Sequence, residues 1–122
     1  MGITTATVRL LNLQDPGRSF EREFIVDTGG VLSFAPASEL SAIGVTPTRI
    51  KEFRLADGSV VRRSVGDVFF EVGGERASAA VVFGEATDEC LLGAVTLESL
   101  GLAVDPVSRR LHPVVLLAVG AR

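Results

Sequence analysis

The sequence contains no tryptophan and no tyrosine, and it has one cysteine and one histidine among its 122 residues. The single cysteine, Cys90, can form neither an intrachain disulfide nor a thiolate metal cage, and such sparse cysteine usage is typical of a reducing compartment. We therefore predict a cytoplasmic protein. Because phenylalanine is the only aromatic residue type, no aromatic hydroxyl or indole group can serve in a functional site.

The sequence also lacks an excess of positive charge and a long hydrophobic run. Its formal net charge is −3 and it has no dense cluster of Lys and Arg, so we expect no nucleic acid as partner. The longest apolar stretch, residues 114–119, is far too short to span a bilayer, and residues 1–6 do not read as a signal peptide. We expect no membrane partner, and the start at Met1 without a linker favours a free-standing protein.

What the sequence does contain is a dense alternation of turn residues and apolar runs. The apolar fraction of 47% against 22% charged residues is typical of a globular chain, and the length suits one domain over residues 1–122. Glycines and prolines separate runs rich in Val, Ile, Phe and Thr, which predicts many short strands. We expect these strands at residues 4–11, 19–26, 31–35, 49–55, 60–72, 76–83, 90–92, 102–105 and 110–119.

Three short segments predict hairpin turns, and two others predict helices. The turns are expected at residues 15–17, 57–58 and 73–74, where Asp-Pro-Gly, Asp-Gly and Gly-Gly supply the backbone freedom of glycine or the fixed φ of proline. The helices are expected at residues 36–43 and 95–100, because each of these segments ends in a glycine suited to a helix C-terminus. The predicted fold class is therefore all-β with one or two short helices.

The most informative stretch is residues 24–30, where an apolar strand runs directly into Asp27, Thr28, Gly29 and Gly30. A carboxylate at the end of an apolar strand is costly unless something uses it. This stretch resembles the active-site turn of the retropepsin-like aspartic proteases, in which apolar residues precede Asp-Thr-Gly. Asp27, Thr28 and Gly29 match that motif residue by residue, and the resemblance implies that they form the catalytic turn.

A second element of the resemblance lies nearer the C-terminus. Leu91, Leu92 and Gly93 precede a predicted helix, and an apolar-apolar-Gly element takes this place in the family, where it packs beside the catalytic turn. The resemblance implies that these three residues support the active site. It also implies a closed-barrel-like retropepsin (acid protease) fold with one domain per chain.

A third element lies between the first two. Residues 53–61 contain a strand, a tight turn and a second strand, in the order expected for the flap that closes over a substrate. Ala56, Asp57, Gly58 and Ser59 form the tip of this hairpin. The resemblance implies that they contact the substrate.

Aspartic protease chemistry needs two carboxylates, one ionised to accept a proton from water and one protonated to polarise the peptide carbonyl. The chain has one Asp-Thr-Gly motif, and the Asp-Gly pair at Asp57 lies in a polar turn that no apolar strand enters. The resemblance therefore implies a homodimer in which a two-fold axis brings Asp27 of each copy together. The expected activity is hydrolysis of a peptide or protein substrate at acidic to mildly acidic pH, without a metal or other cofactor.

Two positions depart from the family pattern and keep alternatives open. Gly30 stands where the family usually has Ala or Ser, and the missing hydroxyl suggests a site that works nearer neutrality. Ala94 stands where viral members often carry a polar or basic residue that helps the dimer. Gly30 favours an alternative, a non-catalytic dimer of the same fold that binds extended peptides or a protein partner. In a third reading the chain is a structural β-domain and Asp27 caps a turn.

Other chemistries have weaker support in the sequence. A Cys-His site would need a base near Cys90, but the only histidine, His112, lies in an apolar segment far along the chain. Glu85, Asp88 and Glu89 form an acidic cluster, yet their spacing does not match a calcium-binding loop, and zinc lacks ligands. We predict no metal site.

The run Val114 to Val119 is too apolar for an ordinary exposed tail. It is either a core strand or a strand at a subunit interface, since terminal strands often build the interface in retropepsins. We predict a dimer strand.

Overall fold

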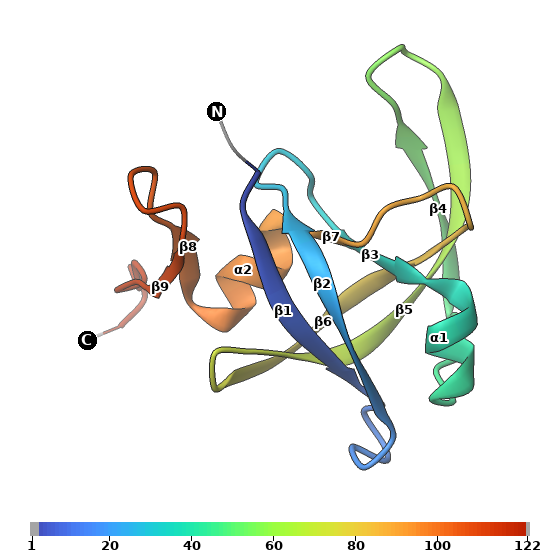
Figure 1. The fold of residues 1–122 in the computed structure, drawn as a ribbon, viewed down its shortest axis with the longest axis horizontal. Coiled ribbons are helices and arrows are strands. Elements are labelled where there is room, and N and C mark those ends of the chain that lie inside the picture. Colours follow the sequence, from blue (N-terminus) through green and yellow to red (C-terminus); the bar gives the residue numbers. More distant parts are fainter. Residues whose placement is uncertain (1–2, 122) are drawn as a thin grey trace.

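The structure, a computed structural model, describes residues 3–121 and is mostly β, with two short helices in this range (Figure 1). The elements are β1 (Thr5–Leu11), β2 (Ser19–Val26), β3 (Ser33–Pro36), α1 (Ala37–Ala42), β4 (Arg49–Arg54), β5 (Val60–Val72), β6 (Glu75–Gly84), β7 (Leu91–Leu92), α2 (Ala94–Leu100), β8 (Leu102–Val104) and β9 (Leu111–Pro113). The predicted all-β class with short helices is confirmed. Among the described residues, no helix combines the length and apolar character needed to cross a membrane.

Seven strands form one sheet of order β1-β2-β7-β3-β6-β5-β4. β1 pairs antiparallel with both β2 and β5, so the pairings of six of these strands run in a circuit that leaves β4 at the edge. The two residues of β7 lie between β2, to which they are parallel, and β3, to which they are antiparallel. The chain therefore inserts a late strand between two early ones, and this insertion positions the site described below.

Alternation along the strands fills the core. In β1, Val8 and Leu10 are fully buried and Arg9 between them is exposed, and in β5 Val68 and Phe70 are buried in the same alternating way. A period of two places every second side chain on one face of a strand. The helices and the residue that follows α1 contribute further apolar side chains to this core, namely Leu40, Ile43, Leu97 and Leu100.

The three predicted turns are present. Residues 73 and 74 join β5 to β6 with positive φ angles of 55° and 87°, which glycine adopts without steric cost. Gly58, with φ of 88°, joins β4 to β5 in the same way. In the first turn, the Arg18 amide donates to the Asp15 carbonyl at 2.9 Å. Turn chemistry thus explains where these hairpins reverse.

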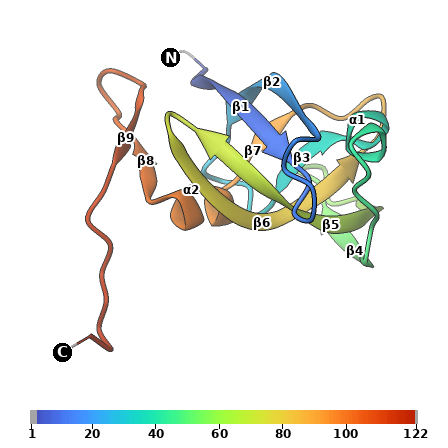
Figure 2. The ribbon, with the colours of Figure 1, turned by 90° about the horizontal axis from the view of Figure 1, so that it is seen from below.

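The C-terminal segment differs from the prediction of a strand over residues 110–119. β9 ends at Pro113 and pairs only with β8, in a separate two-stranded sheet. Figure 2 shows the chain after β9 extending away from the body. Val115 is fully exposed and Leu117 is 90% exposed. The strand prediction is wrong after Pro113 because, within the described residues, no strand pairs with this segment.

Candidate functional site

The site begins where β2 ends. Asp27 follows Val26 directly, and its amide donates to the Leu92 carbonyl of β7 at 2.9 Å. The parallel pairing of Ile25 with Leu91 and of Val26 with Leu92 leads into this bond. The position of the Asp27 backbone is therefore fixed by β7, and its side chain is half-buried.

The two glycines after Thr28 lie close around the Asp27 carboxylate. The Gly29 amide donates to Oδ1 at 3.1 Å, and the Gly30 amide donates to the Asp27 carbonyl at 3.2 Å. A Cβ atom at Gly30 would lie 3.3 Å from Oδ2, and one at Gly29 would lie 3.4 Å from Oδ1. The turn thus holds a carboxylate by one backbone hydrogen bond, a geometry that suits a catalytic aspartate and a turn cap alike.

Gly93 and the start of α2 clamp the loop that follows Asp27, which we call the Asp27 loop (residues 27–32). The amides of Ala94 and Val95 donate to the carbonyls of Gly30 and Val31 at 2.8 and 3.1 Å. A Cβ atom at the buried Gly93 would lie only 2.7 Å from the Leu32 carbonyl group, so the backbones approach as closely as a missing side chain allows. Gly93 therefore packs directly against the loop that carries Asp27.

A buried polar cluster that the sequence analysis missed lies beneath the loop. The Ser33 hydroxyl, fully buried, accepts a hydrogen bond from the Gly93 amide at 2.9 Å and lies 2.5 Å from the hydroxyl of Thr96. Buried polar groups require such partners. The sequence held one signal for this cluster, because each hydroxyl residue has an apolar residue on both sides. Ser33 follows the Asp27 motif, and Thr96 follows Gly93.

The predicted flap is a tight hairpin turn between β4 and β5. The Leu55 amide donates to the Ser59 carbonyl at 2.8 Å, and the Gly58 amide donates to the Leu55 carbonyl at 2.9 Å. Asp57 Oδ1 accepts hydrogen bonds from the hydroxyl and the amide of Ser59. The pKa of Asp57 lies below its usual value, mainly because of the Ser59 hydroxyl. This turn is tied together by its own polar groups.

The Asp27 loop and the hairpin line one cleft of about 680 Å³. Asp27 and Leu91 lie on one part of its wall, and Phe53 lies on another, with its ring 5.5 Å from that of Phe34 in an edge-to-face contact. The lining residues are Asp27, Gly29, Gly30, Val31, Leu32, Phe34, Glu52, Phe53, Arg54, Leu55, Ala56 and Leu91. Largely apolar walls around a carboxylate suit an extended chain with apolar side chains.

The structure brings only part of the predicted site into this cleft. Of the four predicted flap residues, Ala56 lines it, whereas Asp57, Gly58 and Ser59 do not. The lining instead includes residues 52–55, which the sequence analysis did not assign to the substrate because it placed the contact at the turn. Leu92 and Gly93 are buried behind the Asp27 loop.

Thr28 points to a different surface. It is exposed and lines a second concavity, of about 520 Å³, with the other lining residues drawn mainly from α2, β8 and the turn after β8. These are Ala94, Leu97, Glu98, Leu102, Ala103, Val104 and Pro106. Thr28 therefore stands at a mostly apolar surface beside the cleft, and its hydroxyl makes no hydrogen bond within residues 3–121.

The other candidates from the sequence do not form a site. Burial raises the pKa of the Cys90 thiol, which disfavours the nucleophilic thiolate. His112 lies on β9, and its Nδ1 is 3.0 Å from the Pro113 carbonyl oxygen. Asp88 and Glu85 contact Arg63 rather than one another's carboxylates. In the described part of the chain, no three His, Cys, Asp or Glu side chains gather as metal ligands would.

Comparison of the chain with models of known protein families and with curated proteins finds no match. The interpretation of the site therefore depends on its motif and its geometry.

The close approach at Gly93 predicts a large effect of a small substitution. We expect Gly93→Ala to lower the free energy of unfolding by about 1–3 kcal/mol, because its Cβ atom would overlap the Leu32 backbone. Urea unfolding followed by circular dichroism measures this loss. Gly29→Ala is the matched control, since its Cβ atom meets ordinary contact distances, and we expect a change within about 0.5 kcal/mol. Equal effects of the two substitutions would contradict the proposed clamp.

The hairpin turn predicts a shifted titration. We expect Ser59→Ala to raise the pKa of Asp57 toward its usual value, because the hydroxyl is the main cause of the lowering. A carboxyl group whose pKa is lower in the folded state than in the unfolded state stabilises the fold above the unfolded-state pKa, and this stabilisation is lost as the pH falls through the folded-state pKa. In Ser59→Ala the two pKa values of Asp57 lie closer together, so the pH range over which this stabilisation is lost becomes narrower. Carboxyl-carbon NMR titration measures the shift. Asp105, whose lowered pKa comes from the Ser108 and Val107 amides, should titrate unchanged.

Proposed function

We propose that the protein is an aspartic endopeptidase of the retropepsin-like type, with Asp27 of two chains as the catalytic pair. The observation that carries this proposal is the single cleft shared by the Asp27 loop and the hairpin of β4 and β5. Asp-Thr-Gly turns are common enough to arise by chance, but this one opens onto a cleft that a flap-like hairpin also lines. The circuit of strand pairings supports the finer fold proposal, a closed-barrel-like retropepsin domain.

The chemistry requires a second carboxylate that the Asp27 loop does not supply. Glu52 also lines the cleft, but it comes from β4 of the hairpin rather than from a turn that resembles the Asp27 loop. A two-fold axis beside Asp27 would bring two identical carboxylates together on equal terms. Two like charges about 3 Å apart cannot both ionise, so the pair would hold one proton and remain matched to acid-base catalysis.

In the proposed reaction, a water molecule held between the two Asp27 carboxylates attacks the scissile carbonyl carbon. The ionised carboxylate accepts the proton of the water, while the protonated carboxylate donates to the carbonyl oxygen. The resulting gem-diol then collapses as the pair protonates the departing amine. The Gly29 amide, 3.1 Å from Oδ1, would orient the carboxylate throughout, without a metal ion or a covalent intermediate.

Exposed apolar surface beside the site supports the dimer. The concavity next to Thr28 and the segment Val114 to Val119 present apolar atoms to solvent in a single chain. Surfaces of this kind are usually covered by a partner. The segment begins beside the end of α2, where the Val114 amide donates to the Gly101 carbonyl at 3.0 Å. We propose that a second copy covers both, so that residues 114–119 lie at the interface.

The alternative function is peptide or protein binding without cleavage. Gly30 favours it, because no hydroxyl stands beside Oδ2 to adjust the acidity of the pair. The exposed edge strand β4 also offers unpaired backbone groups to an extended partner. In either case the partner would be a peptide or protein, and we propose a cytoplasmic location from the cysteine usage alone.

Cleavage of a diverse peptide mixture between about pH 4 and 7 tests the protease directly. We expect cuts with the unmodified protein and a loss of at least about 10³-fold in rate with Asp27→Asn, which replaces both carboxyl groups of the pair. Asp15→Asn, in the turn between β1 and β2, is the control and should cut normally. Sedimentation shows whether each variant is still a dimer. A folded dimer that makes no cuts at any pH would leave peptide binding as the better function.

The space beside Oδ2 predicts how the acidity of the site can be changed. In Gly30→Ser the new Cβ atom would lie 3.3 Å from Asp27 Oδ2. Its hydroxyl would donate to this oxygen and stabilise the ionised form of the Asp27 carboxyl group. We expect the acidic limb of the pH-rate profile to move to lower pH. Gly17→Ser, in the turn before β2 and so at the opposite end of that strand from Asp27, should leave the profile unchanged. A shift to higher pH in Gly30→Ser would contradict the placement of residue 30 beside the catalytic carboxylate.

A further inference from the structure

The hairpin that lines the cleft overhangs the rest of the sheet. β5 pairs with β6 only from Val65 onward, so residues 60–64 of β5 pair with β4 alone. We call residues 49–64 the hairpin arm; Figure 1 shows it extending away from the other strands. Backbone hydrogen bonds hold the arm together but do not fix where it lies relative to Asp27. Side-chain contacts must therefore set its position.

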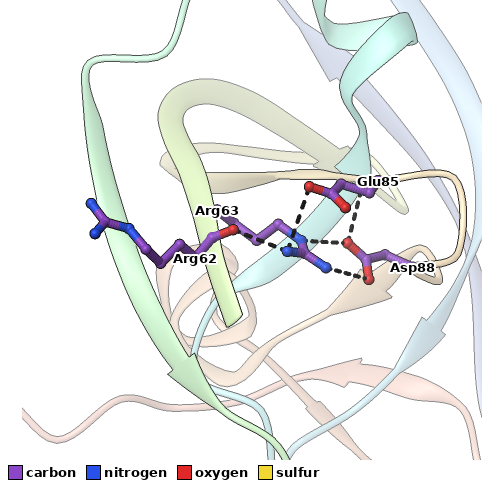
Figure 3. A network of polar contacts seen from close by, with 4 residues as sticks. All are labelled: Arg62, Arg63, Glu85 and Asp88. Atoms are coloured by element: carbon purple, nitrogen blue, oxygen red, sulfur yellow. Dashed lines mark hydrogen bonds and ion pairs between the residues drawn. The ribbon is translucent and has the colours of Figure 1, made fainter. Parts of the chain in front are cut away.

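One such contact is ionic and largely shielded from solvent. Arg63 of the arm donates from Nε to Asp88 Oδ2 at 2.8 Å and from Nη2 to Oδ1 at 3.2 Å (Figure 3). The side chain of Arg63 is 12% exposed and that of Asp88 is 20% exposed, whereas both members of the Arg9–Glu21 pair are about half exposed. A two-pronged, shielded pair holds its geometry far better than an exposed one.

The remaining polar groups of the pair are also occupied. Arg63 Nη1 donates to the Arg62 carbonyl at 2.9 Å and lies 3.6 Å from a Glu85 carboxylate oxygen. Asp88 Oδ2 accepts the Glu85 amide at 2.8 Å, which ties the carboxylate to its own loop (Figure 3). The hydrogen bond from Arg63 is the main reason that the pKa of Asp88 lies below its usual value. The pair is thus anchored at both ends.

Asp88 belongs to the loop that leads into β7, the strand that holds Asp27. At the end of this loop the Cys90 carbonyl accepts the Ile25 amide at 2.9 Å, and two residues later the Leu92 carbonyl accepts the Asp27 amide. The Arg63–Asp88 pair therefore joins the arm to the same short segment that fixes the Asp27 backbone. At the base of the arm, Arg49 also pairs with Asp67 of β5 at 3.1 Å. A further contact of the arm, Phe53 against Phe34, lies at the cleft itself.

We propose that Arg63 and Asp88 are positioning residues that hold the hairpin arm over the Asp27 cleft. Their effect on substrate binding rests on the proposed function, whereas their effect on the arm does not. Without the pair, the arm would pivot about its base near Val65 and Phe53 would leave Phe34. Part of the binding free energy of a substrate would then be used to order the arm. The loss of the pair would therefore weaken substrate binding more than it slows the chemical step.

NMR of the intact protein tests the position of the arm without any cleavage. We expect Asp88→Asn to weaken the cross-relaxation between the Phe34 and Phe53 rings and to introduce microsecond-to-millisecond exchange in the amides of the arm. Arg63→Lys keeps a cation but loses the two-pronged bond, so it should fall between the parent and Asp88→Asn. If Asp88→Asn does not fold, Arg63→Lys carries the test. Unchanged ring contacts and arm amides would overturn the proposal.

An ion pair between β5 and β6 provides the control. Arg76 Nε donates to Glu71 at 3.0 Å near the opposite end of β5, away from the arm. Glu71→Gln removes a similar charge and should leave the arm unchanged, so arm exchange in this variant as well would overturn the proposal.

Cleavage kinetics then separate this proposal from the proposed function. If the parent cuts peptides, we expect Asp88→Asn to raise KM about tenfold with a much smaller change in kcat, because only the positioning of the arm is lost. A fall in kcat at constant KM would overturn the role in substrate binding. If the parent cuts nothing, the protease proposal fails, while the NMR result still decides whether the pair positions the arm.

Discussion

The whole site depends on a two-residue strand inserted between β2 and β3. Leu91 and Leu92 of β7 pair with β2, Leu91 also pairs with Phe34 of β3, and the Leu92 carbonyl accepts the Asp27 amide. Because β7 comes from the far end of the chain, the Asp27 loop cannot take its final shape until residues 65 positions apart have met. At Gly93 the backbone lies so close to the Leu32 carbonyl group that no side chain would fit there. A long-range contact, rather than local turn preference, thus aims the carboxylate.

The same insertion explains why two hydroxyl groups lie buried beneath the Asp27 loop. Placing α2 directly after β7 brings Thr96 against Ser33, and these two hydroxyls would be costly to bury alone. Ser33 also accepts the Gly93 amide, so one small network satisfies the amide at the start of α2 and two side chains. The loop above this network carries Asp27, and its carbonyls are bonded to the helix amides. Rigidity beneath the loop is what a precisely aimed carboxylate requires.

Much of the fold could be predicted from the sequence because it follows local rules. Runs rich in Val, Ile, Phe and Thr predicted β1 and β5, and Asp-Pro-Gly, Asp-Gly and Gly-Gly predicted the turns that flank them. The Asp27 motif and Gly93 were found by their resemblance to a family. Ser33, Thr96 and the Arg63–Asp88 pair were not predicted, because each depends on two residues that meet only in the folded chain. The cleft lining at residues 52–55 was missed because turn chemistry marks the tip of a hairpin and not the strand beside it.

At the C-terminus, the apolar composition of the sequence and the exposure of the same residues in a single chain do not agree. The composition of residues 114–119 demands burial, yet Leu117 is 90% exposed in the single chain. The same holds for chemistry at the Asp27 loop, which supplies one carboxylate where the proposed reaction needs two. Thr28 and the apolar concavity beside it lie next to that loop. One partner, a second copy placed on this side of the molecule, would meet the hydrophobic demand and the chemical demand together, so the two incomplete features support one another.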